Sequence, residues 1–191
     1  MSTIRTFLAI DLSTEARRKS ERYLRPIVSS ETEGVRWTPP NRWHVTLAFL
    51  GDVDPQEVVG ICRAAEEAAR QVDPFFWSLR PIGSFPNPTR PQVVWLGVDD
   101  FDQGMKKLHQ ELNRVLEPLG FPPEGRPFRP HITVGRVHRG ARISPSMKSI
   151  LTEPPPWDGV TEQSDTLLIL SSDLGRNGPD YTVMATVPLG E

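Results

Sequence analysis

Two of the four histidines in the chain head the same short pattern. His44-Val45-Thr46-Leu47 and His131-Ile132-Thr133-Val134 each place a histidine and a threonine two residues apart, with apolar residues between and after them. Side chains on a β-strand alternate between faces, so the histidine and the threonine of each copy would project from one surface, about 6.6–6.8 Å apart along the strand. Two matches among only four histidines argue against coincidence. The pattern therefore predicts two strands that each present an imidazole and a hydroxyl.

Two imidazoles and two hydroxyls in one cleft suit in-line displacement at a phosphodiester. One histidine would take the proton from an attacking water while the other protonates the leaving alkoxide on the opposite side of phosphorus. The threonine hydroxyls would donate to the non-bridging oxygens, where negative charge concentrates. Histidine suits both roles because its unperturbed pKa of about 6.5 lies near neutral pH. A cyclic phosphate is an apt substrate, because ring strain lowers the barrier to opening.

Both motifs fall within predicted strands, 43–50 and 131–137, whose intervening apolar residues would anchor each strand in a core. Other predicted strands are 6–12, 35–38, 75–82, 92–98, 161–171 and 181–187, with a turn at 175–179 that includes Asn177. Predicted helices begin at caps near 13, 54, 100 and 144, and Pro26 should kink or end the first of them. This order favours an α+β fold with antiparallel sheets and helices packed on them. The motifs lie 87 residues apart, so a pseudo-twofold arrangement would bring their strands side by side.

The composition sets broad limits. A chain of 191 residues with 37% hydrophobic residues and a net charge of −2 is long and apolar enough for one folded domain, which we expect to span 1–191. The single cysteine, Cys62, excludes an internal disulfide framework and suits a reducing compartment. The chain has no apolar run long enough to span a bilayer and no signal-peptide pattern at its start. We expect a cytoplasmic monomer that needs no metal or cofactor. The near-neutral net charge argues against broad, non-specific DNA binding, but it is compatible with a local anion-binding groove.

The chain resembles the two-histidine (2H) phosphoesterase superfamily, and most closely its RNA 2′,3′-cyclic phosphodiesterase branch, historically called 2′-5′ RNA ligase. The resemblance covers nearly the whole chain and is carried by residues 5–10, 44–51, 128–136 and 168–174, followed by Tyr181. It implies two pseudo-symmetric lobes of antiparallel sheet with helices on the outer faces and a central V-shaped cleft.

The resemblance also implies a reaction. A terminal 2′,3′-cyclic phosphate of RNA would be opened to a 2′-phosphate without metal, with His44 as proton donor to the leaving 3′ oxygen and His131 as proton acceptor from water. The same site can, in the family, run in reverse and form 2′-5′ linkages. No glycine-rich loop for ATP is present, so nothing supports nucleotide-activated ligation.

Arginines near the motifs are further candidates. Arg129, two residues before His131, could clamp the phosphate through its bidentate guanidinium, or it could be a solvated loop residue. Strict alternation places Arg136 on the face opposite His131, which keeps it out of the site unless a bulge intervenes. Arg36 and Arg42 could add positive potential at the cleft mouth.

The remaining candidates have a structural explanation beside the functional one. Trp37, Trp43 and Phe49 could stack on a base, although alternation favours Phe49 as a core residue. His109 is predicted to lie on a helix without metal-binding partners, and His138 on the surface. Cys62 is predicted to be a buried, inert thiol. The remaining candidates are predicted to be first-turn helix charges, namely Asp99, Asp100 and Asp102.

Two alternatives stay open at this stage. The chain could be a non-catalytic nucleotide- or RNA-binding module that uses the same cleft, although both histidine–threonine pairs are intact. It could also be an enzyme of the same superfamily that acts on a small cyclic phosphate, such as that of ADP-ribose.

Overall fold

Short amphipathic helices alternate with antiparallel strands along the chain. The computed structural model describes residues 3–31, 33–175 and 178–191. Its α-helices are α1 (Thr14–Ser30), α2 (Val58–Ala69), α3 (Gly104–Leu116) and α4 (Pro145–Thr152). Its strands are β1 (Ile4–Asp11), β2 (Val35–Trp37), β3 (His44–Val53), β4 (Phe75–Phe85), β5 (Val93–Asp99), β6 (His131–Val137), β7 (Val160–Ser164), β8 (Thr166–Gly175) and β9 (Gly178–Pro188). Asn177, which the sequence places in a turn between the last two strands, lies outside the described residues.

α1 and α4 begin at the caps that the sequence predicts, whereas Asp54 caps a 3₁₀ turn that precedes α2 and the N-cap of α3 is Gln103 rather than Asp100. The side chain of Ser13 accepts a hydrogen bond from the Ala16 main-chain N–H at the start of α1, and Ser144 does the same for Met147 in α4. Of the kink or end expected at Pro26, the end does not occur, because α1 continues to Ser30. The neighbouring residues Leu24 and Ile27 are both buried, and this packing outweighs the hydrogen bond that a proline cannot make.

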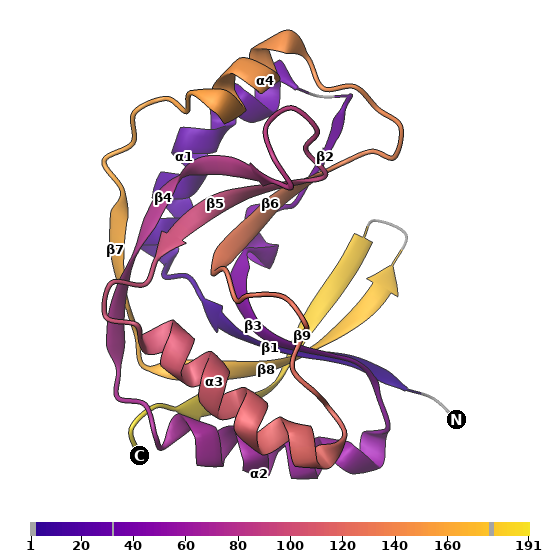
Figure 1. Cartoon of the computed structure of the whole chain (residues 1–191), viewed down its shortest axis with the longest axis vertical. Helices are drawn as coiled ribbons and strands as arrows, with labels where there is room; N and C mark the ends of the chain where they lie inside the picture. The colour runs from indigo at the N-terminus through magenta and orange to yellow at the C-terminus, as the bar shows by residue number, and fades with distance from the viewer. Residues whose placement is uncertain (1–2, 32, 176–177) are drawn as a thin grey trace.

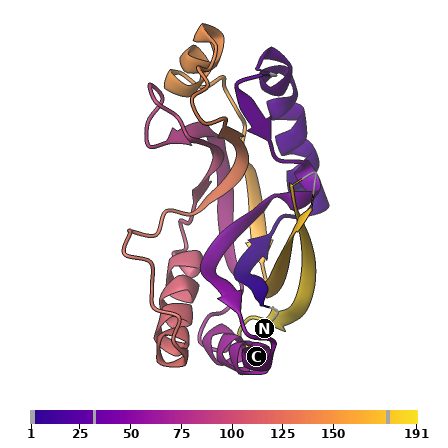
Figure 2. The ribbon, with the colours of Figure 1, turned by 90° about the vertical axis from the view of Figure 1, so that its right-hand side faces the viewer.

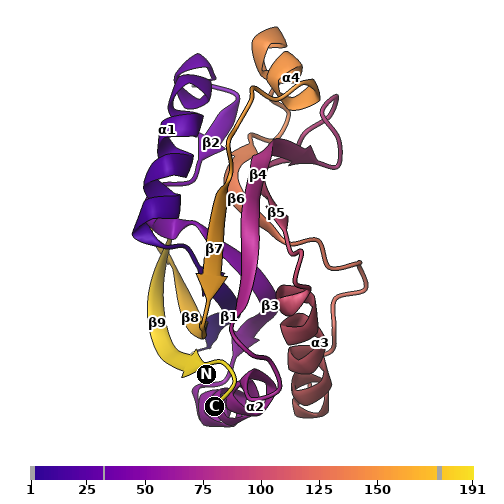
Figure 3. The ribbon, with the colours of Figure 1, turned by 90° about the vertical axis from the view of Figure 1, so that its left-hand side faces the viewer.

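The strands form one curled antiparallel sheet in the order β7-β4-β5-β6-β3-β1-β8-β9, with β2 added beside β6. Figure 1 shows the sheet as a half-barrel, with α1 and α4 on the half built from β4 to β7 and with α2 and α3 on the other half. The two halves meet where Val45 of β3 pairs with Ile132 of β6. The α+β fold with two antiparallel halves and outer helices is confirmed, and Figures 2 and 3 show the same division from the two sides.

The stretch predicted as a single strand over 161–171 is two strands in the structure. β7 pairs with β4 in one half of the sheet, and β8 pairs with β1 in the other half. Buried positions are even-numbered in β7, where Val160 is buried, whereas the first buried positions of β8 are the odd-numbered Leu167 and Ile169. Asp165 separates the two strands, so the chain crosses between the halves there and the alternation slips by one residue.

The core supports the motif strands from behind. Val45 and Ile132 have no exposed surface, and Leu47 and Val134 are buried in the same continuous apolar cluster. A smaller cluster of Phe7, Ala9 and Leu170 packs separately. Within the described part of the chain, none of the helices is both long and apolar enough to cross a membrane.

Candidate active site

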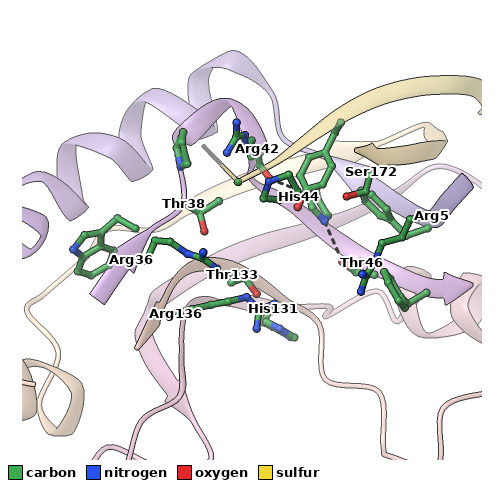
Figure 4. Close-up of a pocket in the computed structure, with 17 residues that line it drawn as sticks. Arg5, Arg36, Thr38, Arg42, His44, Thr46, His131, Thr133, Arg136 and Ser172 are labelled. Carbon is green, nitrogen blue, oxygen red and sulfur yellow. Dashed lines mark hydrogen bonds between the residues drawn. The ribbon is translucent and has the colours of Figure 1, made fainter. Parts of the chain in front are cut away.

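A cleft of about 580 Å³ contains the histidine and threonine of both motifs. His44 and Thr46 come from β3, and His131 and Thr133 come from β6 (Figure 4). The strands that carry them join the two halves of the sheet, so the cleft lies over the line where these halves meet. The sequence pattern thus predicts four residues that the structure brings to one surface.

The strand pairing relates the two motifs by an approximate twofold. Val45 and Ile132 are the middle residues of the two His-x-Thr triplets, and they pair in antiparallel register. This direction places His44 on the side of Thr133 and Thr46 on the side of His131. With ordinary strand spacings, the two histidine Cα atoms would stand roughly 8 Å apart on the diagonal. Each imidazole therefore has the threonine of the other motif as its neighbour across the strands.

The two imidazole rings are held in the same way. Nδ1 of His44 lies 2.9 Å from the main-chain carbonyl oxygen of Arg42, and Nδ1 of His131 lies 2.7 Å from that of Arg129. A carbonyl oxygen can only accept, so Nδ1 carries the proton and donates it in both rings. The neutral ring then has its lone pair on Nε2, while the protonated ring has an Nε2–H. Each Nε2 can therefore accept or donate a proton without any change in the bond that orients the ring.

The surroundings of the two histidines differ. Nε2 of His44 lies 3.1 Å from the Thr46 hydroxyl, which donates to it when the ring is neutral. The ring of His44 lies against Phe7 and Tyr181, at centroid distances of 4.9 and 5.3 Å. His131 instead meets the edge of Phe85 at 5.0 Å. The near symmetry of the backbone thus supports two chemically distinct imidazoles.

Both imidazoles are easier to deprotonate than a free histidine. Burial lowers the pKa of His44 below its ordinary value of 6.5, with Arg17 and His131 acting in the same direction against the Arg42 carbonyl and Asp11. Burial also lowers the pKa of His131, and the positive charge of Arg136 adds to this against the Arg129 carbonyl. A positive charge on His131 therefore disfavours a positive charge on His44.

The charged side chains that line the cleft are all cationic. They are Arg5, Arg36, Arg42 and Arg136, and no aspartate or glutamate belongs to the described lining. Arg42 also forms an ion pair of 2.7 Å with Asp180, at the start of β9. Burial raises the pKa of Tyr181, although the charges of Arg136, Arg42 and Arg5 oppose the shift. Such a lining favours an anion in the cleft.

Arg136 lines the cleft, contrary to its expected place on the opposite face. In the pairing of β5 with β6, Val94 is opposite Gly135 and the next residue, Trp95, is opposite Thr133. Val134 is therefore the extra residue of a β-bulge, which reverses the alternation after it. Arg136 consequently shares the face of His131 and Thr133.

A second bulge explains why the core placement expected for Phe49 is wrong. Ala9 pairs with Thr46 and Leu8 with Ala48, which leaves Leu47 as the extra residue of β3. Phe49 is therefore on the cleft side, 43% exposed, with the guanidinium of Arg5 5.0 Å from its ring centroid. Trp37 also lines the cleft, whereas Trp43 is buried and its indole N–H donates to the Thr38 carbonyl.

Arg129 does not line the cleft. Its side chain is exposed, and its contact with the site is the main-chain carbonyl that orients His131. The phosphate clamp expected of Arg129 therefore has no support from its placement. Arg36 and Arg42 do line the cleft, as expected.

Sequence reasoning gave no site role to Arg5, Thr38, Ser172 and Tyr181, which also line the cleft. A signal for Arg5 was present, because Arg5 and Phe7 are two residues apart on β1 and β1 pairs with the first motif strand. The others depend on long-range contacts that no local pattern encodes.

His109 connects the first motif strand to the loop that precedes the second. Its Nδ1–H donates to the carbonyl of Leu47 at 2.7 Å, and its Nε2 accepts from the Asn113 amide at 3.1 Å. Its ring stacks on Phe128 at 4.2 Å, in the loop that leads to the second motif. His109 therefore ties the bulge of β3 to the approach to β6.

The aspartates considered as metal ligands have structural partners. Asp100 accepts from the main-chain N–H groups of Met105 and Lys106 at the start of α3, Asp102 accepts from that of Phe76, and Asp99 pairs with Arg80. No cluster of three or more metal-ligand side chains (His, Cys, Asp, Glu) occurs within residues 3–31, 33–175 and 178–191. Cys62 is partly buried against the core.

Comparison with known proteins places this arrangement in a family. A protein from Thermotoga maritima named RNA 2′,3′-cyclic phosphodiesterase is 33% identical over 95% of this chain and 93% of its own length. One of the same name from Methanothermobacter thermautotrophicus is 33% identical over 95% of this chain and 96% of its own. The crystal structure of E. coli LigT complexed with 3′-AMP superposes with a TM-score of 0.78, at 26% identity over 99% of each chain.

The family model described as LigT like Phosphoesterase matches the chain twice, at residues 10–95 and 96–157. Each match contains one of the two histidine–threonine motifs, in agreement with the pseudo-twofold of the cleft. These matches cover well over half of the residues, and the chain therefore belongs to the LigT-like phosphoesterase family.

Proposed function

We propose that this phosphoesterase opens 2′,3′-cyclic phosphate ends of RNA to 2′-phosphates, by metal-independent acid–base catalysis between His44 and His131. The observation that carries the proposal is the pair of imidazoles held through Nδ1 by main-chain carbonyls, in one cationic cleft. The relatives named RNA 2′,3′-cyclic phosphodiesterase supply the substrate class.

The proton balance of the reaction needs one neutral and one protonated ring. The Nε2 lone pair of neutral His131 takes a proton from water as the water oxygen forms a bond to phosphorus. The bond from phosphorus to O3′ breaks on the opposite side, and the Nε2–H of protonated His44 passes its proton to O3′. The products are a 2′-phosphate and a free 3′-hydroxyl, and exchange with solvent returns each ring to its starting state.

The remaining groups of the cleft stabilise charge. Thr46 and Thr133 donate hydroxyl hydrogen bonds to the non-bridging oxygens, which gain negative charge in the transition state. Arg136, on the same strand face as His131, adds a cation beside the phosphate. The anionic substrate in turn favours the protonated form of His44, which offsets the effect of burial on its pKa.

Ligation uses the same groups with a different nucleophile. A 5′-hydroxyl in place of water would lose its proton to His131 and form a 2′-5′ linkage while O3′ leaves with the proton of His44. The cleft has a volume of about 580 Å³, which leaves room for the end of a second RNA strand. We place this reaction second, because water needs no binding site of its own.

The deciding experiment uses an oligoribonucleotide that ends in a 2′,3′-cyclic phosphate, in the presence of a metal chelator. We expect a 2′-phosphate product, identified by its resistance to a 3′-phosphate-specific enzyme. A 3′-phosphate product would contradict the proposed role of His44 as donor to O3′. Loss of activity on addition of chelator, with recovery on addition of a divalent metal, would contradict metal independence.

Matched variants test the two histidines on a mononucleoside 2′,3′-cyclic phosphate. His44→Ala and His131→Ala should each lower kcat by about 10²–10⁴-fold. His138→Ala is the control, because His138 is an exposed histidine outside the cleft. Full activity in either motif variant would refute the mechanism. Tight nucleotide binding without turnover would instead favour a binding module, and faster turnover of an ADP-ribose cyclic phosphate than of RNA ends would favour a small-molecule enzyme.

A further inference from the structure

A second hollow of about 590 Å³ lies beyond the end of the second motif strand. It is formed by the tip of the hairpin between β4 and β5, residues 89–92, and by the connection from β6 to α4, residues 137–143, with one residue of α4. Figure 1 shows the hairpin tip and this connection in the same half of the molecule, the half that carries α4. We call it the basic hollow, because Arg90, Arg139, Arg142 and Lys148 line it.

The cations of the basic hollow are not neutralised by the protein. All four side chains are exposed, and within the described residues none of their charged groups forms an ion pair or a hydrogen bond. No acidic residue belongs to the described lining. The chain as a whole carries a net charge of −2, so this gathering of positive charge is local. Such a surface attracts an anion with more than one charge.

The frame of the basic hollow is fixed by hydrogen bonds. The carboxylate of Glu31, which is 5% exposed, accepts from the main-chain N–H of Gly34 at 2.9 Å and from that of Ser144 at 2.7 Å. The main-chain N–H of Val137 donates to the carbonyl of Gln92 at 3.0 Å, which joins the two loops directly. The cations therefore extend from an ordered rim.

The basic hollow lies at the end of β6 that is farther from His131, and Val137 reaches it from the strand face opposite the cleft, because consecutive strand residues alternate between faces. Arg136 lines the cleft and the next residue, Val137, lines the basic hollow. Arg36 of β2 pairs with Arg136, so two arginines of the cleft lie at this end of β6. From His131 to Val137 the strand extends for about 20 Å, a distance that an oligonucleotide can span and a mononucleotide cannot.

The two linings differ in their aromatic content. The cleft contains Phe7, Trp37, Phe49 and Tyr181, whereas the described lining of the basic hollow has no phenylalanine, tyrosine or tryptophan. Bases stack on aromatic rings, while backbone phosphates need cations alone. The cleft is therefore suited to the terminal nucleotide, and the basic hollow to phosphates farther along the strand.

We infer that the basic hollow binds the sugar–phosphate backbone of a single-stranded RNA whose cyclic phosphate end occupies the cleft. This inference rests on the proposed function and specifies its substrate as an oligonucleotide, held without regard to base sequence. It predicts that the enzyme prefers an oligomer over a mononucleotide and that the preference depends on salt concentration.

The test compares Arg139→Gln/Lys148→Gln with Arg63→Gln/Lys107→Gln. The second pair removes the same charges from exposed positions on α2 and α3, in the other half of the molecule. The substrates are a mononucleoside 2′,3′-cyclic phosphate and a ten-nucleotide RNA with the same end. The first double variant should lose about tenfold in kcat/KM on the RNA at low salt, while its activity on the mononucleotide stays within about twofold of the original.

Salt dependence provides the second readout. The slope of log kcat/KM for RNA against log salt should become shallower by about 0.7 for each phosphate contact removed, and the control double variant should keep the original slope. Equal losses on both substrates, or equal losses in both double variants, would overturn the inference.

The outcomes separate this inference from the proposed function. Turnover of both substrates with no preference for RNA would leave the function standing and refute a role for the basic hollow. If neither substrate turns over, the proposed function fails, and fluorescence anisotropy with an uncyclised ten-nucleotide RNA decides the inference instead. Binding weakened by Arg139→Gln/Lys148→Gln alone would support it, and equal binding by all three proteins would refute it. Inorganic phosphate is the last probe. If phosphate inhibits mononucleotide turnover in the original protein but not in Arg139→Gln/Lys148→Gln, the basic hollow is a site for free anions and the inference is overturned.

Discussion

Val45 and Ile132 pair where the two halves of the sheet meet, and each is the middle residue of a His-x-Thr triplet. Neither side chain has any exposed surface, so each strand is anchored from behind while its histidine and threonine stay on the cleft side. One apolar pair thus sets the register of both imidazoles. The catalytic geometry that we propose depends on this register, because a slip of one residue would turn one motif into the core.

The pH profile of kcat/KM should be a bell whose maximum lies below pH 6.5. The profile of kcat/KM reports the pKa values of the free enzyme. Burial lowers the pKa of both His44 and His131 below 6.5, so the midpoint of the two values also falls below it. The profile of kcat should lie at higher pH, because the bound phosphate anion raises the pKa of its neighbours. A flat kcat/KM between pH 5 and 9, measured on a mononucleoside cyclic phosphate, would argue against the acid–base pair.

Thr46→Val and Thr133→Val should each lower kcat by about 10²-fold, because each removes one hydroxyl donor to a non-bridging oxygen. Only Thr46→Val should also alter the titration of a histidine, because the Thr46 hydroxyl lies 3.1 Å from Nε2 of His44. Steady-state turnover measures the change in kcat, and an NMR titration of the imidazole signals measures the change in the titration of His44. Thr→Ser at either position is the control and should retain most of the activity. A Thr46→Val enzyme with unchanged kcat would show that this hydroxyl does not act on the phosphate.

Arg136→Ala should lower kcat/KM by at least about tenfold, since a charge-assisted hydrogen bond to an anion contributes about 1.5–3 kcal/mol. It should also move the limb of the pH profile that belongs to His131 to higher pH, because the charge of Arg136 lowers the pKa of that ring. Arg129→Ala is the matched control. It retains the main-chain carbonyl that orients His131 and should leave kcat/KM almost unchanged. A larger loss in Arg129→Ala than in Arg136→Ala would reverse this assignment.

Local alternation and capping were sufficient to predict the motif strands and the starts of α1 and α4. The meeting of His44 with His131 in one cleft followed from the duplicated motif and from the family resemblance. The prediction failed where the alternation breaks. The bulges at Leu47 and Val134 turn Phe49 and Arg136 toward the cleft. Gly135, next to the second bulge, is a cue that strict alternation ignores, whereas the first bulge has no glycine or proline beside it. A bulge is set by the pairing of two distant strands, so a single strand's composition does not encode it.

His109→Leu should reduce both stability and activity. It removes the donor to the Leu47 carbonyl and the acceptor for Asn113, which should lower the free energy of unfolding by about 1–3 kcal/mol. Activity should fall further than the unfolded fraction explains, because the carbonyl that loses its partner is at the bulge next to Thr46. Gln110→Leu, at the neighbouring exposed position on α3, is the control. Denaturant unfolding and turnover of the remaining folded enzyme separate the two effects, and a His109→Leu enzyme as active and stable as the control would contradict the link.

Glu31→Gln should destabilise the protein at neutral pH and have a smaller effect in acid. Burial raises the pKa of Glu31, but the hydrogen bonds from Ser144 and Gly34 outweigh it, so the pKa in the folded protein lies below the ordinary 4.5. The stabilising contribution of the carboxylate is therefore complete above pH 4.5 and is lost as the pH falls through the folded-state pKa. A Cβ atom at residue 34 would lie 2.5 Å from a carboxylate oxygen of Glu31, so the glycine leaves the space that this contact needs. At pH 7 the free energy of unfolding should fall by about 1.5–3 kcal/mol relative to the exposed control Glu33→Gln. A difference between the two variants that stayed constant from pH 7 to pH 3 would show that the charge of Glu31 does not hold the loops together.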